Sequence, residues 1–559
     1  MNKFFKKTVV LLLAIVCAMG SLSLFGCSND GPKSSHVKDQ VYDPNKAQLY
    51  VSNFNGGVGT EWLYRNIEKF QKEYKDVKFT EDTTGVQVWV DAHKNSGAAT
   101  AEKMAIEKNQ IYFLGGSNYL DMVATGKLYD MTHVVKGSLY EVGEGDETGD
   151  GVVTIESKLS EDYQNYYGIG TGEDRKYYAL PHYEIFSTIT YDVDIFDEKT
   201  LFFDTNGNLN KKSTDTGRGT GPNGISGDFD DVLPRTYEEF FRLCETMELR
   251  GVDPIIWSGM YPFYTTECLA MLRNDYEGKD ELTARIKFNG GTMTKLVNSV
   301  DSKGNITFKP ATVINESNAA DTFSSAGILY ALRFLDKIID NGWYASASVN
   351  EATSHTGAQA TFLTSKYNSK TNPIGMLVEG TYWTHESSDT FRSMKSRYKN
   401  SSLEERNLAI MPLPKVDESQ LGPMTIASGG SICAINGNVT PGSDIALLAE
   451  LFVKYCHTND ALTDFFMTTN VPRGFTYTLS NEQLAKVTPF GKSVRTLIEN
   501  SNRVMAVYNS DFSYNNYTAL ASLAAFATSY ATDPVTALRK GTSPETIFNE
   551  IRTTIRTFR

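Results

Sequence analysis

Paired cysteines, catalytic signature motifs and an excess of positive charge are all missing from this 559-residue chain. Its six cysteines form no CxxC pair, and it contains no GxxxxGKS/T, GxSxG or HExxH motif. The seven histidines are scattered, and none pairs with another at metal-ligand spacing. Lys and Arg total 54 against 67 Asp and Glu, and this net charge of -13 argues against a protein that binds nucleic-acid phosphates. What remains is an acidic chain whose function must be inferred from other features.

The only long apolar segment lies at the N-terminus. Three lysines precede it, and residues 8–29 carry no charge. This order is typical of a secretory signal, although the length would also suit a single membrane-spanning anchor. The letters LFGC, which end at Cys27, favour the signal because they resemble a bacterial lipobox, in which Cys27 would be lipid-modified. The alternative is that Cys27 is an ordinary apolar residue of the signal region.

The expected N-terminal organisation is a lipoprotein signal peptide over 1–26 followed by a flexible tether over 27–47, which has no apolar periodicity. The rest of the chain would then lie outside the cytoplasm, lipid-anchored to the outer face of the cell membrane. Four cysteines remain beyond this region, Cys244, Cys268, Cys433 and Cys456. We expect them to be buried thiols, with a disulfide as the alternative.

Hydrophobic periodicity predicts an α/β chain. Strands are expected at 49–51, 77–79, 86–88 and 111–114, and an amphipathic helix at 61–74, where apolar residues recur every three or four positions. Further helices are expected at 237–249, opened by a capping box, at 445–456, and after Ser543-Pro544, where Ile547, Ile551 and Ile555 recur every four residues. A segment rich in Asp and Gly, at about 201–235, is expected to be an irregular insert.

Aromatic residues are unusually frequent, because 30 Tyr, 30 Phe and 5 Trp make up 12% of the chain. Several lie in turns rich in Gly, Asn and Ser, and sugars offer C–H faces that stack on rings and hydroxyls that bond to polar side chains. These turns predict carbohydrate-binding residues at Asn53, Asn55, Gly57, Gly116, Ser117, His182, Tyr183, Trp257, Trp383, Arg473, Tyr514 and Tyr517. For each aromatic residue alone, an ordinary core or surface position is the alternative, and Trp62 on the first helix is expected to be packed.

Two acidic loops partly match a calcium-binding pattern. Asp204, Asn206 and Asn208 place oxygen-bearing side chains at alternate positions, and residues 146–151 (DETGDG) are a second partial match. Solvated acidic turns are the alternative for both. The expected state is therefore no metal and no cofactor, with Asp204, Asn206 and Asn208 as the calcium candidates. The GxGxxG match at 219–224 follows no strand and is expected to be a loop.

Several motifs share the order found in a known family. They are YVSNFNGGVGTEWL at 50–63, YYALPHYEIFSTITYDVDIF at 177–196, GMLVEGTYW at 375–383, LAIMPLPK with ASGGSICAI at 408–435, and ALLAELFVKYCHTNDAL with NVPRG at 446–474. With the lipobox, they make the chain resemble the family 1, carbohydrate-binding type of extracellular solute-binding proteins of ABC transporters. The resemblance spans nearly the whole chain.

The resemblance implies a two-lobed, periplasmic-binding-protein-like α/β fold, in which discontinuous lobes are joined by a hinge. Lobe one would comprise 48–183 and 430–475, and lobe two 184–429 and 476–559. Trp383 would be a stacking tryptophan, and Tyr514 or Tyr517 a further stacking ring of lobe two.

The implied function is that of a monomeric substrate-binding lipoprotein without enzymatic activity. It would capture an oligosaccharide or other sugar between its lobes and deliver it to ABC permease subunits in the membrane. One alternative is an extracellular glycoside hydrolase, and another is the same fold binding a peptide or other small solute.

Overall fold

The computed structural model describes residues 37–93, 101–115, 119–217, 219–524, 526, 533–554 and 558. The predicted lipidation site Cys27 and two predicted ligand-binding residues, Gly116 and Ser117, lie outside the described residues. The described chain folds as two compact units, each assembled from segments that are distant in sequence. Unit 1 contains the described residues up to Ile185 together with Gly429–Lys486 and Val507–Tyr514, and unit 2 contains Phe186–Ser428, Val487–Ala506 and the described part of Asn515–Arg559.

Unit 1 is built on a five-stranded mixed sheet of order β2-β1-β3-β18-β6. These strands are β1 (Ala47–Phe54), β2 (Val86–His93), β3 (Ile111–Leu114), β6 (Leu180–Pro181) and β18 (Ile432–Ile435). β1 is parallel to β2 and β3, whereas β18 runs antiparallel to β3 and β6. The carboxyl ends of β1 and β3 therefore lie at the same sheet edge as the start of β18 and the end of β6. The prediction of a strand at 77–79 is wrong, because this segment forms only an isolated bridge from Lys78 to Thr84.

The first predicted helix is confirmed as α2 (Glu61–Glu73), which packs on α15 (Asn459–Thr469). Its apolar stripe, which includes Leu63, Ile67 and Phe70, is fully buried. The prediction that Trp62 is a core residue is also confirmed, since its ring meets Phe113 and Phe465 edge-on at 5.0 Å each. α14 (Asp444–Tyr455), capped by Ser443, corresponds to the helix predicted at 445–456.

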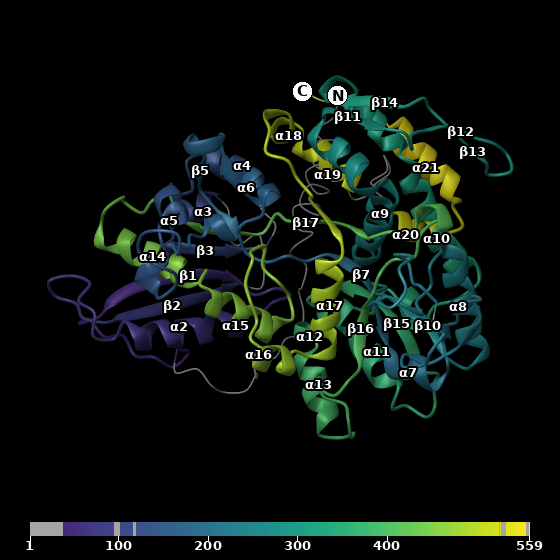
Figure 1. Ribbon diagram of the computed structural model, residues 1–559, viewed down its shortest axis with the longest axis horizontal. Coiled ribbons are helices and arrows are strands. Elements are labelled where there is room, and N and C mark those ends of the chain that lie inside the picture. The colour runs from purple at the N-terminus through teal and green to yellow at the C-terminus, as the bar shows by residue number, and fades with distance from the viewer. Residues whose placement is uncertain are drawn as a thin grey trace. The chain divides into compact units, whose positions relative to one another are not determined.

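The remaining elements of unit 1 are short. They are the helices α3 (Ala101–Ile106), α4 (Tyr119–Ala124), α5 (Thr132–Lys136), α6 (Glu161–Tyr167), α16 (Asn481–Lys486) and α18 (Asp511–Asn515, whose last residue belongs to unit 2), the 3-10 turns Tyr140–Val142, Glu156–Lys158 and Gly172–Asp174, and the strands β4 (Gly168–Ile169) and β5 (Lys176–Tyr177). Figure 1 shows α14 and α15 in green beside the purple strands β1 and β2, so segments far apart in sequence complete this unit.

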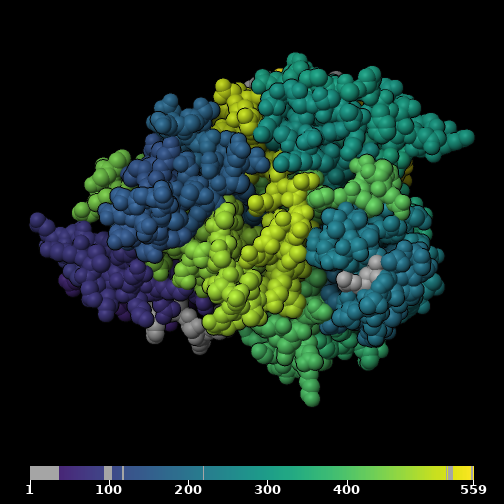
Figure 2. Space-filling view, in the orientation of Figure 1, coloured from purple at the N-terminus to yellow at the C-terminus, as the bar shows by residue number. Residues whose placement is uncertain are grey.

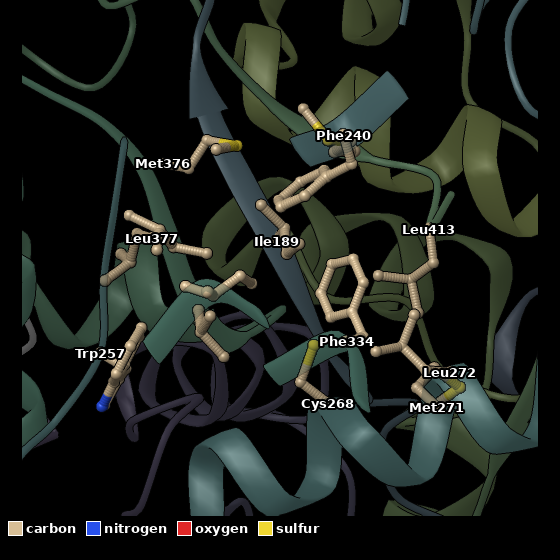
Figure 3. Packing of buried hydrophobic residues seen from close by; sticks show 14 of the residues in the cluster. Ile189, Phe240, Trp257, Cys268, Met271, Leu272, Phe334, Met376, Leu377 and Leu413 are labelled. Carbon is tan, nitrogen blue, oxygen red and sulfur yellow. The ribbon is translucent and has the colours of Figure 1, made fainter. Parts of the chain in front are cut away.

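Unit 2 is built on a four-stranded sheet of order β10-β15-β7-β16. These strands are β7 (Ser187–Asp192), β10 (Asp253–Ile256), β15 (Ile374–Gly380) and β16 (Leu408–Met411). β10 and β15 are parallel, and β7 is antiparallel to both β15 and β16. All six residues of β7 and all seven of β15 are buried, as expected for strands covered on both faces. Figure 3 shows this core, in which Ile189 and Leu377 of the sheet lie near Phe240, Phe334 and Cys268 from the covering helices.

Unit 2 contains more helical residues than strand residues. Its helices are α7 (Val193–Glu198), α8 (Tyr237–Leu249), α9 (Phe263–Lys287), α10 (Ala326–Asp340), α11 (His355–Ser365), α12 (Trp383–Glu386), α13 (Ser388–Lys395), α17 (Pro489–Glu499), α19 (Tyr517–Ala524), α20 (Pro534–Arg539) and α21 (Pro544–Thr553), with 3-10 turns at Glu316–Ser324, Ser346–Val349 and Glu418–Gln420. α8 has the predicted bounds, and the Thr236 side chain caps it by accepting from the Glu239 N–H. The reciprocal half of the capping box is absent, because the Glu239 carboxylate binds Arg235 instead. α21 confirms the last predicted helix, although Ile555 lies outside the described residues.

Unit 2 also contains short strand pairs that are separate from its main sheet. They are β8 (Phe202–Phe203) with β9 (Leu209–Lys211), β11 (Asn289–Met293) with β14 (Thr312–Asn315), β12 (Val297–Val300) with β13 (Ile306–Phe308), and β17 (Thr425–Ser428) with β19 (Asn502–Met505). The β12–β13 hairpin projects from the surface, as Figure 2 shows at the tip of the teal segment. β8 and β9 belong to the predicted Asp/Gly-rich insert, so part of that insert is a short hairpin.

The four cysteines of the described chain are buried and unbonded, which confirms the prediction of buried thiols. Burial raises the pKa of each of these thiols. Within the described residues, the structure contains no helix that is both long and apolar enough to span a membrane.

The units differ from the predicted lobes in their C-terminal segments. Residues 476–486 and 507–514 group with unit 1, whereas the sequence placed them in lobe two. Hydrogen bonds give the reason: Asn459 in α15 binds the backbone of Thr478 at both its N–H and its carbonyl, and the Asn509 amide donates to the backbone carbonyls of Tyr166 and Gly168. These contacts tie both segments to unit 1.

Candidate functional site

In unit 1, the turn after β1 contains three of the predicted binding residues. The Asn53 amide nitrogen donates to the Gly59 carbonyl at 3.2 Å and to the Thr60 hydroxyl at 3.0 Å, and that hydroxyl donates to Asn55 Oδ1 at 2.6 Å. Gly57 has a φ of 66°, a left-handed conformation that favours glycine. The two asparagines therefore shape the turn that leads into α2. Asn53 Oδ1 is buried without a hydrogen-bond partner among the described residues, so this turn retains one unused acceptor.

Two aromatic rings converge on the neighbouring strand end. A Cβ atom built on Gly115, directly after β3, would lie 2.5 Å from the Tyr183 hydroxyl and 2.6 Å from the Phe54 ring. Ser431 fixes Tyr183 by accepting from its N–H and donating to its carbonyl, which holds residue 183 beside the start of β18. The structure thus brings the Asn53–Gly57 turn and Tyr183 to one edge of the unit 1 sheet. Phe54, the last residue of β1, lies between the two asparagines but was not among the predicted binding residues.

His182 and Arg473 have structural surroundings rather than the ligand contacts that the sequence predicted. The His182 ring is fully buried among aromatic rings, and its pKa is lowered by burial and by the Arg473 charge. The Arg473 guanidinium donates to the backbone carbonyls of Pro181, His182 and Cys456, and it also contacts His457 Nε2 at 3.0 Å. Because these partners occupy the guanidinium, Arg473 joins β6 to the end of α14 instead of pointing at a ligand.

The two C-terminal tyrosine candidates fall in different units. Tyr514 belongs to unit 1 and is 36% exposed, and its hydroxyl donates to Asp121 Oδ1 at 3.4 Å. Tyr517 opens α19 in unit 2 and is half-buried. Tyr514 therefore keeps a ring available for stacking.

The two tryptophan candidates are core residues of unit 2, which corrects the predicted stacking role of Trp383. Its ring is fully buried between Phe362, Phe391 and Phe490, with centroids 5.7–6.1 Å away, and its indole nitrogen donates to the Thr190 hydroxyl at 3.0 Å. Trp257, directly after β10, is 1% exposed, but its indole nitrogen has no hydrogen-bond partner among the described residues. Figure 3 shows this nitrogen directed away from the labelled core side chains.

A cluster of carboxyl groups, which the sequence analysis did not single out, surrounds the carboxyl end of β15 in unit 2. Glu379 is its penultimate residue, Glu386 ends α12, and Glu267 lies on α9. The Gln359 amide donates to Glu379 at 3.1 Å and to Glu386 at 2.9 Å, and the Ser187 hydroxyl donates to Glu267 at 2.7 Å. The carboxyl ends of parallel strands are where α/β sheets bind ligands, and β10 and β15 are the parallel pair here. We call these three residues the carboxyl cluster.

The carboxyl cluster is electrostatically unusual. Burial raises the pKa of Glu267 to about 7. Burial, followed by repulsion from Glu386, raises the pKa of Glu379 well above its ordinary value. Burial also lowers the pKa of His355, which stacks on Tyr264, to about 4. Acids kept in surroundings that disfavour their charge are common at functional sites, which makes the cluster the best candidate site in unit 2.

Replacing Glu267 with glutamine is expected to stabilise the protein above pH 7. The folded-state pKa of Glu267 is raised, so the folded protein binds this proton more tightly, and wild-type stability falls as pH rises from about 4.5 to about 7. Glu267→Gln removes that penalty, which amounts to at most about 3 kcal/mol at pH 8 and vanishes near pH 4. Urea unfolding of both proteins at pH 4 and pH 8 measures the difference. An equal difference at the two pH values would contradict the raised pKa.

The calcium candidates form a closed turn in the insert of unit 2. Asp204 Oδ1 accepts the N–H groups of Asn206 and Asn208 at 2.8 Å each, and Oδ2 accepts the side-chain amides of Asn208 and Asn210. These hydrogen bonds lower the pKa of Asp204 to about 2. A cation at Asp204 would have to displace these donors, so the amide groups already do what an ion would do in ordering the turn.

No protein-family model and no curated protein matches this sequence. Solved structures match it by fold. A chitin oligosaccharide binding protein aligns with a TM-score of 0.53 at 15% identity, over 91% of this chain and 98% of that chain. SBP RafE in complex with raffinose aligns with a TM-score of 0.53 at 12% identity, over 91% and 98%. A probable secreted solute-binding lipoprotein from Streptomyces coelicolor aligns with a TM-score of 0.51 at 11% identity, over 92% and 100%.

These likenesses extend over 91–92% of this chain, and the aligned structures are covered almost completely. At this level of identity they establish the fold. The predicted fold class is therefore confirmed: the chain has the two-lobed α/β fold shared by these solute-binding proteins.

Proposed function

We propose that this chain is the substrate-binding lipoprotein of an ABC importer and that it binds an oligosaccharide or another sugar. The observation that carries the proposal is the fold, which is shared over 91% of the chain with a chitin oligosaccharide binding protein and with a raffinose complex. A fold alone does not select a ligand, because one fold can carry many functions. Support for a sugar must therefore come from the chemistry of the candidate residues.

Both units offer groups that suit a polyhydroxylated ligand. In unit 1, the Phe54 and Tyr183 rings, which are 4% and 6% exposed, lie beside a turn that keeps an unused amide oxygen on Asn53. In unit 2, the carboxyl cluster supplies oxygens that can accept hydrogen bonds from sugar hydroxyls. Rings that stack on C–H faces and acceptors that bind hydroxyls are the combination that sugar recognition requires. This chemistry favours a sugar over an apolar ligand.

The N-terminal pattern supports the proposed location. A basic start, an apolar stretch and the LFGC lipobox predict export and lipid attachment at Cys27, on the outer side of the membrane. A protein held there by a lipid can collect solutes and present them to permease subunits in the same membrane. Ligand binding would then favour the permease-competent conformation by as much as the ligand prefers that conformation.

A thermal-shift screen of the full chain against oligosaccharides, peptides and small solutes tests this function. At least one oligosaccharide is expected to raise the Tm, because a ligand that binds only the folded state adds to its stability. Glu386→Gln is expected to weaken the affinity for that sugar about tenfold, since a lost charge-assisted hydrogen bond costs about 1.4 kcal/mol. Glu351→Gln, which replaces an exposed carboxylate of the same unit, is the matched control and should leave the affinity unchanged.

Three outcomes would contradict the proposal. A peptide or another solute could raise the Tm while no sugar does so, which would retain the fold but change the ligand class. The oligosaccharide could be cleaved during incubation, and loss of cleavage in one carboxyl variant would identify a glycoside hydrolase. Equal sugar affinity in Glu386→Gln and wild type would remove the carboxyl cluster from the site.

A further inference from the structure

A second group of carboxylates lies in the Asp/Gly-rich insert of unit 2, away from the predicted calcium turn in sequence. The side chains of Asp228, Asp230 and Asp231 each place one carboxylate oxygen within 4.8 Å of the others. Asp230 and Asp231 are 1% and 5% exposed, and Asp228 is half-buried. We call these residues the triple-aspartate cluster. Three acids so close together repel one another unless a cation or a proton lies among them.

The backbone around the cluster is held in place. The Val232 N–H donates to the Gly219 carbonyl, and the Phe203 N–H of β8 donates to the Val232 carbonyl, at 2.9 Å each. Asn223 then orders two of the acids, because its N–H donates to Asp230 Oδ2 at 3.0 Å and its amide donates to Asp228 Oδ2 at 2.6 Å. These hydrogen bonds therefore fix the backbone of the loop and the positions of two of the three carboxylates.

One oxygen of the cluster is left without a donor. Asp230 Oδ1 is buried and has no hydrogen-bond partner among the described residues, although a buried carboxylate oxygen is costly to leave unsatisfied. A Cβ atom on Gly221 would come within 2.6 Å of this oxygen and 2.1 Å of the Asp230 carbonyl, so only glycine lets the chain approach so closely. Gly221 has a φ of 65°, which also favours glycine. The loop thus brings backbone and carboxylate oxygens together.

The charges of the cluster favour a bound cation. Three carboxyl groups lie close together, and Asp230 and Asp231 are buried, where water screens their repulsion little. A cation among them would neutralise this repulsion. Oxygen-only ligands suit hard cations, and Ca²⁺ accepts irregular sets of six to eight oxygens, whereas Mg²⁺ demands near-ideal octahedral geometry.

We infer that Asp228, Asp230 and Asp231 form a calcium site that stabilises the Asp/Gly-rich insert of unit 2. The ion is coordinated by the three carboxylates, and backbone carbonyls and water complete its six to eight ligands. Residues 224–227, which directly precede the cluster in sequence, are exposed. Its role is structural, and it does not depend on which solute the protein binds.

Calorimetric titration and thermal unfolding of the full chain with calcium chloride, magnesium chloride and EDTA test this site. Calcium at 100 times its dissociation constant is expected to raise the Tm of unit 2 by about 4 °C, and EDTA should reverse the increase. Asp230→Asn and Asp228→Asn should each abolish the calcium-dependent increase. Each should still fold in EDTA, because removing one charge relieves repulsion. Asp204→Asn, in the neighbouring closed turn, is the matched control and should keep the full increase.

Several results would overturn the inference. Millimolar calcium could leave both the Tm and the titration heat unchanged, which would mean that a proton rather than a cation neutralises the cluster. The increase could survive in Asp230→Asn and Asp228→Asn, which would exclude these ligands. Its loss in Asp204→Asn alone would move the calcium to the Asp204 turn. None of these results touches sugar binding, so failure here and failure of the proposed function are distinguishable.

Discussion

Replacing Trp383 with alanine is expected to lower the free energy of unfolding by about 3–5 kcal/mol, the usual cost of deleting a buried large aromatic side chain. The ring is fully enclosed by Phe362, Phe391 and Phe490, so its removal leaves a cavity that these rings cannot fill without moving. The Thr190 hydroxyl also loses the indole N–H that donates to it. Urea unfolding followed by fluorescence and circular dichroism measures the loss.

A second variant separates packing from sugar recognition at this position. Trp383→Phe keeps most of the ring volume and loses the hydrogen bond to Thr190, so the expected loss of stability is about 1–2 kcal/mol. Because the side chain is buried, this variant should bind its sugar with wild-type affinity once it is folded. A folded Trp383→Phe protein that no longer binds sugar would restore the stacking role that the sequence predicted.

Local sequence patterns were sufficient for the four helices that the sequence predicted, whereas α9 and α10 were not predicted. The 3.6-residue spacing of Leu63, Ile67 and Phe70 identified α2, and Thr236 identified the first residue of α8, because an amphipathic stripe and a cap are encoded within a few residues. The strand expected at 77–79 failed for the complementary reason. A strand needs a partner, and Lys78 finds only a single bridge.

Burial of aromatic residues could not be predicted in the same way. Trp383 and Trp257 both follow strand ends next to glycine or serine, as a ligand-stacking ring would, but the side chains that enclose them come from distant parts of the chain, such as Phe490 for Trp383 and Tyr344 for Trp257. Neither the composition nor the spacing of residues predicts such contacts between distant parts of the chain. Tyr183 and Asn53 did lie at a strand-end edge, because their positions relative to β6 and β1 are local.

The carboxyl cluster was missed for a related reason. With 67 acidic residues, no sequence pattern separates Glu267, Glu379 and Glu386 from the others. Their distinguishing property is that the parallel pair β10 and β15 ends beside α9 and α12, which only the folded unit reveals. Burial then raises the pKa values of Glu267 and Glu379. A site of this kind is defined by topology first and by residue type second.

The second large loss of stability is expected at Arg473 in unit 1. Arg473→Met is expected to lower the free energy of unfolding by about 3 kcal/mol or more. Arg473 is 2% exposed, and its loss removes the hydrogen bonds that it donates to the carbonyls of Pro181, His182 and Cys456. Each unsatisfied buried carbonyl costs about 1–3 kcal/mol, while the desolvation of the removed charge, which lowers the pKa of Arg473, offsets part of the loss.

Arg473→Lys is the informative control for that variant, because it keeps the positive charge. Lysine cannot span three carbonyls and His457 from a single ammonium group, so Arg473→Lys should be nearly as unstable as Arg473→Met. Urea unfolding gives both stabilities, and calorimetric titration with the sugar gives both affinities. If the arginine is a structural clamp, the folded fraction of each variant binds sugar normally. Full stability with lost affinity would instead make Arg473 a ligand contact, and the hydrogen bonds at β6 would then be dispensable for folding.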